Sequence, residues 1–165
     1  MPRTAYLALG SNLGDRLAYL RDAVARLRAA EGVEVLRLSR VYETDPIGIT
    51  AQPPFLNMVL EAGIPDSLPA RDLLRLVKRI EADLGRQGRE CWGPREIDID
   101  VLLIGEERVN DPDFQLPHPR MWERAFVVVP LADLVPEMMA PGGQRVVELA
   151  QRLRQEQGIH AHLSL

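Results

Sequence analysis

The sequence has 165 residues, of which 46% are hydrophobic and 27% are charged, an ordinary composition for one globular domain over residues 1–165. Its formal net charge of −4 argues against a nucleic-acid partner, whose phosphates require a broad basic surface. The one cysteine, Cys91, cannot form an internal disulfide, which predicts a cytoplasmic protein. No apolar stretch approaches the ~18 residues of a membrane span, so we expect no membrane partner, and we further expect a monomer.

The first half of the chain predicts a strand, a helix and two more strands. Residues 5–9 form an apolar strand that Gly10-Ser11-Asn12 should end, and Asp15 can cap the helix that follows. A second strand is expected over residues 33–42 and a third over residues 55–62. The helix carries one apolar stripe, made of Leu17, Leu20, Val24 and Leu27.

The second half predicts a second helix, a fourth strand and further helical segments. Ser67 is a candidate N-cap for a helix that Gly85 should end, and residues 97–104 form a strongly apolar strand. Shorter helices are expected after Met121 and across residues 146–157. The order β-α-β-β-α-β indicates an α+β fold with a ferredoxin-like core, which is a mainly antiparallel sheet with helices packed on it.

Two connections are longer than this fold needs, over residues 43–54 and 85–95. Loops of ten or more residues are uncommon in compact domains unless they bind something. We therefore expect these segments to be mobile active-site loops.

The strongest local signal for function is the pair Asp98 and Asp100 in the fourth strand. Side chains alternate along a strand, so both carboxylates lie on one face, about 6.5 Å apart, together with Leu102 and Ile104. Two such charges repel unless one is protonated or a cation lies between them, and magnesium suits carboxylates that share a site with phosphates. The alternative is that both aspartates face solvent on an edge strand.

Basic side chains gather around this pair. The rigid turn Trp92-Gly93-Pro94-Arg95 directly precedes the strand and places a guanidinium at the same end as the carboxylates. The other candidate phosphate contacts are Arg86, Arg89, His118 and Arg124. Enzymes that transfer phosphoryl groups commonly use a metal ion together with arginines to stabilise the negative charge of the phosphates. Each arginine taken alone is most often a solvated surface residue, and a lone histidine is usually structural. His118, however, is held between two prolines and is therefore suited to a fixed phosphate contact.

An aromatic ring and an amide alternate in the third strand, at Phe55 and Asn57. Because they share a face, they offer a flat plate beside a group that both donates and accepts hydrogen bonds. This combination suits a flat heterocycle, and Phe126 is a candidate for a second plate. All three residues can equally belong to the core or to the end of a strand.

Blocks of sequence spread in order over nearly the whole chain resemble the 6-hydroxymethyl-7,8-dihydropterin pyrophosphokinases of folate biosynthesis. The blocks are LGSNLGD at 9–15, YETDPIG at 42–48, QPPFLN at 52–57, WGPREIDID at 92–100 and LPHPRM at 116–121. The resemblance implies an ATP-dependent diphosphotransferase that moves pyrophosphate from ATP to the hydroxymethyl group of the pterin, giving AMP and the pterin pyrophosphate.

The resemblance also implies residue roles. Two magnesium ions would bind Asp98 and Asp100, which act in catalysis together with Arg86 and Arg95. ATP would be contacted by Arg86, Arg89, Trp92, Arg95, His118 and Arg124. The pterin would lie between Phe55 and Phe126, with its edge contacted by Thr44, Ile47 and Asn57.

The loop after Gly85 departs from the family pattern. Gly88 and Cys91 occupy places where arginine is common, and Arg89 is a candidate replacement for one of them. On the preceding helix, Glu81 is placed to orient an arginine, whereas Lys78 reads more simply as a surface residue.

Two other function classes compete with this assignment. An RNA-binding module of the same strand order predicts exposed aromatic residues and a basic face. The 5% aromatic content, the negative charge and the aspartates, expected on a central strand, oppose it. A different ATP-dependent transferase or hydrolase could use the same metal pair, and only the Phe55–Asn57 slot and the family resemblance favour a pterin acceptor.

Overall fold

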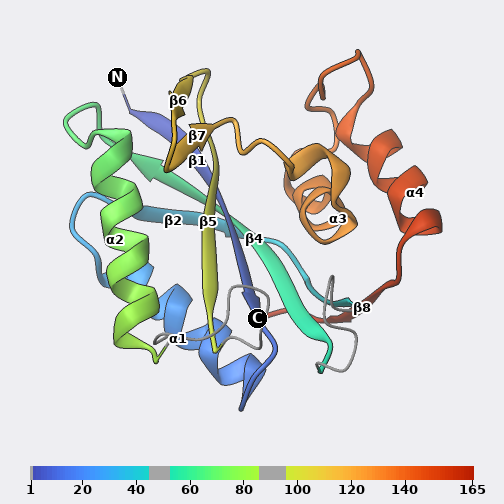
Figure 1. The fold of residues 1–165 in the computed structure, drawn as a ribbon, viewed down its shortest axis with the longest axis horizontal. Coiled ribbons are helices and arrows are strands. Elements are labelled where there is room, and N and C mark those ends of the chain that lie inside the picture. Colours follow the sequence, from blue (N-terminus) through green and yellow to red (C-terminus); the bar gives the residue numbers. More distant parts are fainter. Residues whose placement is uncertain (1, 45–52, 86–95) are drawn as a thin grey trace.

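The computed structural model describes residues 2–44, 53–85 and 96–165. Its centre is a six-stranded sheet in the order β5-β1-β4-β3-β8, and β2 pairs with β4 as well (Figure 1). Every pairing in this sheet is antiparallel. The strands are β1 (Arg3–Ser11), β2 (Glu34–Leu38), β3 (Val41–Thr44), β4 (Phe55–Ile64), β5 (Asp98–Ile104) and β8 (Ile159–Leu163).

The order β5, β1, β4 and then the β2–β3 pair is that of a ferredoxin-like sheet, which confirms the predicted fold class. The single strand expected over residues 33–42 is wrong, because the chain is interrupted at Ser39. The Ser39 N–H donates to the Val59 carbonyl at 2.9 Å, and the Ser39 hydroxyl accepts from the Val59 N–H at 2.8 Å. The Ser39 hydroxyl thus takes the place of a backbone carbonyl as the hydrogen-bond acceptor for β4, between the end of β2 and the start of β3.

The expected end of the first strand at Gly10 is also wrong. β1 continues through Ser11, because Gly10 and Ser11 pair with Asn57 and Leu56 of β4. A glycine inside a strand often marks a place where another group approaches the backbone closely. The group that approaches Gly10 belongs to the candidate site described below.

The helices form a layer on each side of the sheet. In Figure 1, α1 (Arg16–Ala29) and α2 (Ala70–Asp83) lie on one side, and α3 (Ala125–Leu134) and α4 (Val146–Glu156) lie on the other. Two buried clusters match these layers, one with residues of α1 and α2 and one with residues of α3 and α4. No helix among the described residues is long and apolar enough to cross a membrane.

The predicted helix boundaries hold at two ends and fail at one. Asp15 caps α1 as expected, since its Oδ1 accepts from the Ala18 N–H at 3.1 Å. Gly85 follows α2 with a φ of 111°, which a residue with a side chain rarely adopts. The expected N-cap Ser67 is wrong, because α2 begins two residues later, after Pro69, whose carbonyl accepts the first helical hydrogen bonds.

Three short elements complete the described structure between β5 and α3. Strands β6 (Val109–Asp111) and β7 (Phe114–Leu116) form a separate hairpin, and η1 (Met121–Glu123) is a single 3-10 turn. The helical segments expected after Met121 and across residues 146–157 correspond to α3 and α4. The hairpin and β8 were not predicted from the sequence.

Candidate active site

Asp98 and Asp100 lie on the same face of the sheet, as their spacing predicted. Asp98 is paired with Gly10, and Gly10 is in turn paired with Asn57. Asn57 pairs with Tyr42, which is buried in the cluster beneath α3 and α4. Since residues directly opposite each other in antiparallel strands share a face, Asp98, Gly10, Asn57 and Tyr42 form one row across the sheet, under α3 and α4.

Two details of the aspartate strand differ from expectation. Ile104 lies on the opposite face from the aspartates, in the α1–α2 cluster, because the pairing of β1 with β5 shifts register between Tyr6 and Leu7. Strand β5 is also an edge strand and not a central one. Even so, both aspartates are only partly exposed, so neither the open-solvent alternative nor the central position describes them.

A buried carboxylate from α2 occupies the open edge of β5. Glu81 is 3% exposed, and its Oε2 accepts a hydrogen bond of 2.7 Å from the N–H of Ile99, the residue between the two aspartates. Its Oε1 lies 3.4 Å from the Lys78 Nζ. Glu81 therefore supplies the acceptor that a further strand would otherwise provide, and it fixes the backbone that carries both aspartates.

The environment of Asp100 disfavours a negative charge. Burial, reinforced by the charge of Asp98 and to a smaller degree by Glu81, raises the pKa of Asp100 to about 7. Lys78 and Arg124 act in the opposite direction but do not cancel these effects. A carboxyl group in this state is one that a cation would convert to its charged form.

The aspartates supply only part of a metal coordination shell. Among residues 2–44, 53–85 and 96–165, no group of three or more His, Cys, Asp or Glu side chains is arranged to hold an ion. Magnesium retains several water ligands and commonly binds through one or two carboxylates together with substrate phosphates. Asp98 and Asp100 match such a partial set of ligands.

The shifted pKa predicts how the stability of the metal-free protein changes with pH. The pKa of Asp100 is about 7 in the folded chain, against about 3.9 for an aspartate in an unfolded chain. Between these two values the folded chain therefore holds a proton that the unfolded chain releases. Stability should therefore fall as pH rises through this window. We expect Asp100 to lower the free energy of unfolding by up to about 1 kcal/mol between pH 6 and pH 8.

Urea denaturation in the presence of a chelator measures this effect. Asp100→Asn should lose the Asp100 part of the pH dependence, so the wild-type-minus-variant difference should change between pH 6 and pH 8. If the free energies of unfolding of the wild type and of Asp100→Asn changed in parallel with pH, the raised pKa of Asp100 would be contradicted.

Two basic side chains interact electrostatically with the carboxylates. Arg124 is partly buried and its Nε has no hydrogen-bond partner among the described residues. Burial, and then the charge of Arg120, lower the pKa of Arg124, while Asp100 and Asp98 oppose this. The pKa of His118 is lowered too, first by burial and then by Arg124. His118 is held beside β5 because its N–H donates to the Leu102 carbonyl at 2.9 Å.

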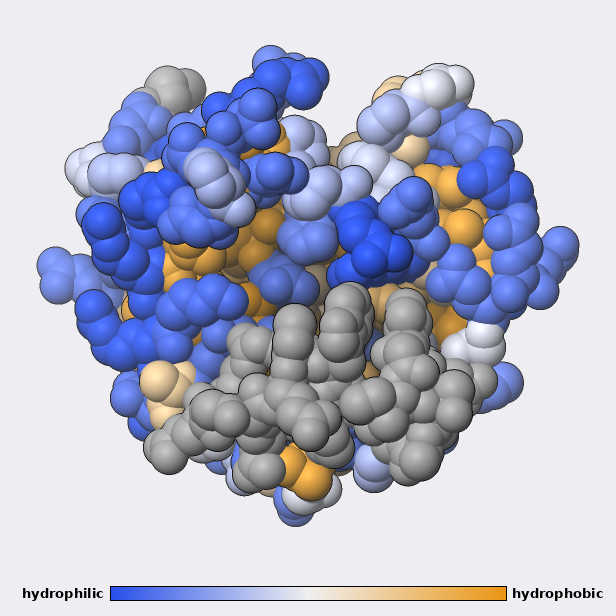
Figure 2. All heavy atoms as spheres, in the orientation of Figure 1, coloured by the Kyte–Doolittle hydropathy of each residue, from blue (hydrophilic) through white to orange (hydrophobic). Residues whose placement is uncertain are grey.

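A pocket of about 340 Å³ opens beside Asp100, between α2, β5 and the β6–β7 hairpin. Figure 2 shows hydrophobic atoms at the surface between α2 and β5, bordered by hydrophilic side chains. Arg71 of α2 ties the hairpin to the helix through ion pairs with Asp111 at 2.6 Å and Asp113 at 2.9 Å. The lining includes Leu74, Lys78, Ile99, Val101, Phe114 and His118.

A second set of side chains lies on the same sheet face, at the far side of Gly10. The Asn57 Nδ2 donates to the Thr44 Oγ1 at 2.6 Å, and both residues are buried. A Cβ on Gly10 would lie 2.7 Å from the Asn57 Oδ1 and 3.5 Å from the Phe55 ring. The absence of a side chain at Gly10 is therefore what admits Asn57 to this position, a role that the sequence alone did not reveal.

Phe126, the second predicted plate, lies in the first turn of α3, which packs on this face. The Arg124 guanidinium lies over its ring, 5.4 Å from the centroid. One predicted phosphate contact thus touches one predicted heterocycle contact. The predicted site residues Ile47, Arg86, Arg89, Trp92 and Arg95 lie outside the described residues, as do Gly88 and Cys91.

Comparison with known proteins identifies the family. The model of the family described as 7,8-dihydro-6-hydroxymethylpterin-pyrophosphokinase matches residues 6–136. This chain belongs to that family. The match takes in the described aspartates, the Thr44–Asn57 pair, His118, Arg124 and Phe126.

Two bacterial pyrophosphokinases are similar to this chain over most of their own length. The 2-amino-4-hydroxy-6-hydroxymethyldihydropteridine pyrophosphokinase of Bacillus subtilis is 48% identical over 134 residues, which cover 81% of this chain and 79% of that protein. The Methylorubrum extorquens enzyme of the same name is 45% identical over 149 residues, which cover 90% and 92%. A mitochondrial folate synthesis bifunctional protein of Pisum sativum is 43% identical, and there the match spans 78% of this chain but 24% of that protein.

Solved structures share the fold at low sequence identity. The crystal structure of Plasmodium falciparum HPPK-DHPS with pteroate superposes with a TM-score of 0.71 at 14% identity, covering 92% of this chain and 42% of that one. The chain thus spans less than half of that larger protein. At this identity the likeness concerns the fold alone.

Proposed function

We propose that this chain transfers the terminal pyrophosphate of ATP to the hydroxymethyl oxygen of 6-hydroxymethyl-7,8-dihydropterin, giving AMP and the pterin pyrophosphate. Family membership supports the reaction class. The observation that carries the proposal is the row across the sheet, in which Asp98 and Asn57 flank Gly10 on one face. A site for charged phosphates and a site for a flat heterocycle are thereby separated by one glycine.

The phosphate half of the site centres on β5. Asp98 and Asp100 would hold two magnesium ions, which supply charge neutralisation for the phosphates and polarisation of the incoming hydroxyl group. Arg124 and His118 flank the carboxylates and would contact phosphate oxygens. The predicted contacts from Arg86, Arg89, Trp92 and Arg95 remain predictions.

The pocket beside Asp100 fits the nucleoside part of ATP. Its lining includes Leu74 and Phe114, which suit a flat base, and also Asp100 and His118. A nucleoside held there would place its phosphate tail at the carboxylates. This arrangement uses the unpredicted β6–β7 hairpin as one wall of the pocket.

The pterin half centres on Asn57. Because its Nδ2 donates to Thr44, the Asn57 amide has a defined orientation, and its carbonyl oxygen lies beside Gly10. Phe55 and Phe126 would enclose the ring, while Thr44, Asn57 and the predicted Ile47 contact its edge. An amide with one fixed donor bond is suited to recognise the donor and acceptor pattern of a pterin edge.

The mechanism would be in-line attack of the pterin hydroxyl oxygen on the β-phosphorus of ATP, with AMP as the leaving group. A loose transition state places little demand on a general base, so positioning and charge neutralisation account for most of the catalysis. The chain's own contribution is to orient both substrates on one rigid sheet face and to keep opposite charges close to the phosphates.

Product analysis tests this proposal. The chain is incubated with ATP, magnesium and the pterin, and nucleotides are separated by chromatography. We expect AMP and pterin pyrophosphate in equal amounts. ADP as the nucleotide product, or AMP formed equally well without the pterin, would refute attack by the pterin on the β-phosphorus.

The glycine between the two half-sites gives a sharper test of the pterin assignment. Gly10→Ala adds a Cβ that would lie 2.7 Å from the Asn57 Oδ1, so Asn57 must move. The backbone of Gly10 does not have a positive φ, and alanine is otherwise tolerated there. We expect KM for the pterin to rise about tenfold or more, since a displaced contact of this kind costs a polar interaction with the substrate.

Gly63→Ala is the matched control on the same sheet. Its Cβ would meet only Leu36 at 3.7 Å and Glu34 at 3.9 Å, which are ordinary contacts. Steady-state kinetics should show a wild-type KM for this variant. If Gly10→Ala had the same KM as Gly63→Ala, Asn57 would not be a pterin contact.

A further inference from the structure

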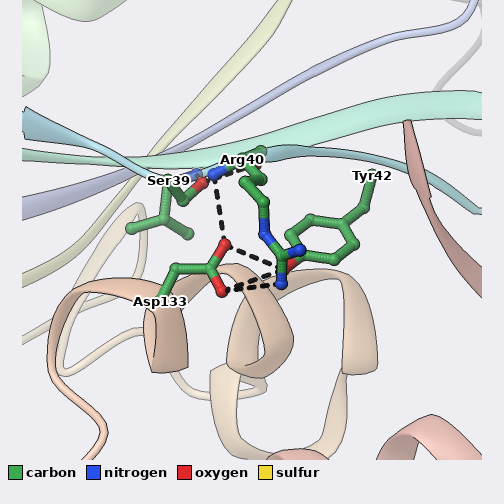
Figure 3. Close-up of polar contacts among 5 residues, drawn as sticks. Ser39, Arg40, Tyr42 and Asp133 are labelled. Carbon is green, nitrogen blue, oxygen red and sulfur yellow. Dashed lines mark hydrogen bonds and ion pairs between the residues drawn. The ribbon is translucent and has the colours of Figure 1, made fainter. Parts of the chain in front are cut away.

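A buried tyrosine links the candidate pterin site to helix α3. Tyr42 has no exposed surface, and its hydroxyl lies 2.9 Å and 2.8 Å from the two carboxylate oxygens of Asp133. Figure 3 shows Asp133 pointing from the helix toward the strand and the Tyr42 ring reaching toward it. Burial and the bond to Asp133 raise the pKa of Tyr42 to about 12, so its hydroxyl keeps its proton.

The Asp133 carboxylate also accepts hydrogen bonds from Arg40. The Arg40 N–H donates to Asp133 at 3.1 Å, and the Arg40 guanidinium lies 3.4 Å from Asp133 (Figure 3). The guanidinium groups of Arg40 and of Arg154 on α4 lie 5.4 Å and 5.8 Å from the Tyr42 ring centroid. Tyr42 and Asp133 thus join β3, α3 and α4 at one point.

The two ends of this link are both connected to the pterin site. Tyr42 is paired with Asn57 and lies two residues before Thr44, whose hydroxyl orients the Asn57 amide. Asp133 lies near the end of α3, and Phe126 lies in its first turn, about 10 Å away along the helix axis. The hydrogen bond therefore runs from the strand that carries the amide to the helix that carries the aromatic plate.

We propose that Tyr42 and Asp133 are positioning residues for the pterin acceptor, holding α3 at the distance from β3 and β4 at which Phe126 encloses the ring. The inference rests on the proposed pterin site. Neither residue touches the substrate in this account. Loss of their bond would let α3 shift on the sheet, and a small displacement of a substrate-enclosing group is enough to weaken binding strongly.

A second tyrosine–carboxylate hydrogen bond, between Tyr6 and Glu61, serves as a control, because it does not involve a helix. The Tyr6 hydroxyl donates to the Glu61 Oε2 at 2.7 Å, and Arg37 binds the same carboxylate at 2.9 Å and 2.8 Å. Tyr6, Glu61 and Arg37 lie on β1, β4 and β2, so this network joins strand to strand. It has the same chemistry, and Tyr6 and Tyr42 belong to the same buried cluster.

Tyr42→Phe and Tyr6→Phe each remove one oxygen atom and keep the ring. We expect Tyr42→Phe to raise KM for the pterin about tenfold while KM for ATP stays within about twofold of wild type. Tyr6→Phe should leave both constants unchanged although it lowers the melting temperature by a similar amount. Equal KM values for the two variants would reduce Tyr42 to a purely structural residue and overturn the proposal.

Changes at Asp133 provide a rescue test and cover the case in which Tyr42→Phe does not fold. Asp133→Asn keeps an oxygen acceptor for the tyrosine and should retain a KM close to wild type. Asp133→Leu removes the acceptor and should behave like Tyr42→Phe. A wild-type pterin KM in Asp133→Leu would contradict the proposal independently of Tyr42.

Phe126→Ala separates failure of this inference from failure of the pterin site. If Phe126→Ala raises KM for the pterin and the Tyr42 and Asp133→Leu variants do not, the positioning role is wrong and the site stands. If Phe126→Ala leaves KM for the pterin unchanged, the site assignment fails and the positioning role fails with it.

Discussion

Asp100→Asn is expected to lower kcat by about a thousandfold, with a similar loss in Asp98→Asn. Each change keeps the size of the side chain and removes one of the two charges that would hold magnesium against the phosphates. Because the pKa of Asp100 is raised by burial and by Asp98, this pair depends on an added cation more than an exposed pair would. Steady-state rates over a magnesium titration measure the effect.

An exposed carboxylate on α2 gives the control for these variants. Asp72 forms an ion pair with Arg75 at 2.8 Å on the surface of the helix, so Asp72→Asn should keep the wild-type rate. Circular dichroism and melting temperature should show that the Asp98 and Asp100 variants fold. Near-normal turnover in both would remove the metal from this account.

Arg124→Ala is expected to reduce kcat/KM for ATP about a hundredfold. The guanidinium is partly buried, its Nε lacks a partner among the described residues, and burial lowers its pKa. A phosphate oxygen would supply the missing acceptor and would stabilise the charged form of the side chain. Since Arg124 also lies over the Phe126 ring, KM for the pterin should rise as well. Arg124→Lys keeps the charge but not the planar fork, and it should recover only part of the activity.

A neighbouring arginine tests whether the effect belongs to this position. Arg120 is exposed and lies 3.6 Å from Glu123, and its contact with His118 uses only the backbone N–H. Arg120→Ala should therefore stay within about twofold of wild type. If both alanine variants lost activity equally, local charge in general, and not a phosphate contact by Arg124, would explain the result.

Features that depend only on neighbouring residues in the sequence could be predicted. Alternation along a strand was sufficient to place Asp98 with Asp100, and Phe55 with Asn57, on common faces. The capping chemistry of Asp15 and the positive φ of Gly85 were likewise local properties. The order of elements was sufficient for the ferredoxin-like fold.

Features that depend on contacts between distant segments could not be predicted. Gly10 looked like the end of a strand, and only the pairing of β1 with β4 shows that it makes room for Asn57. Glu81 was expected to orient an arginine, and only the packing of α2 on β5 reveals its bond to Ile99. Strand β8 has exposed histidines at positions 160 and 162 and is defined by its pairing with β3.

The most direct test is a crystal structure of the chain with manganese, a non-hydrolysable ATP analogue and the pterin, with the metals located by anomalous scattering. We predict two manganese peaks at the carboxylates of Asp98 and Asp100, with the pterin ring between Phe55 and Phe126. Metal peaks bound elsewhere, with both carboxylates free of any ion in the presence of the nucleotide, would contradict the account.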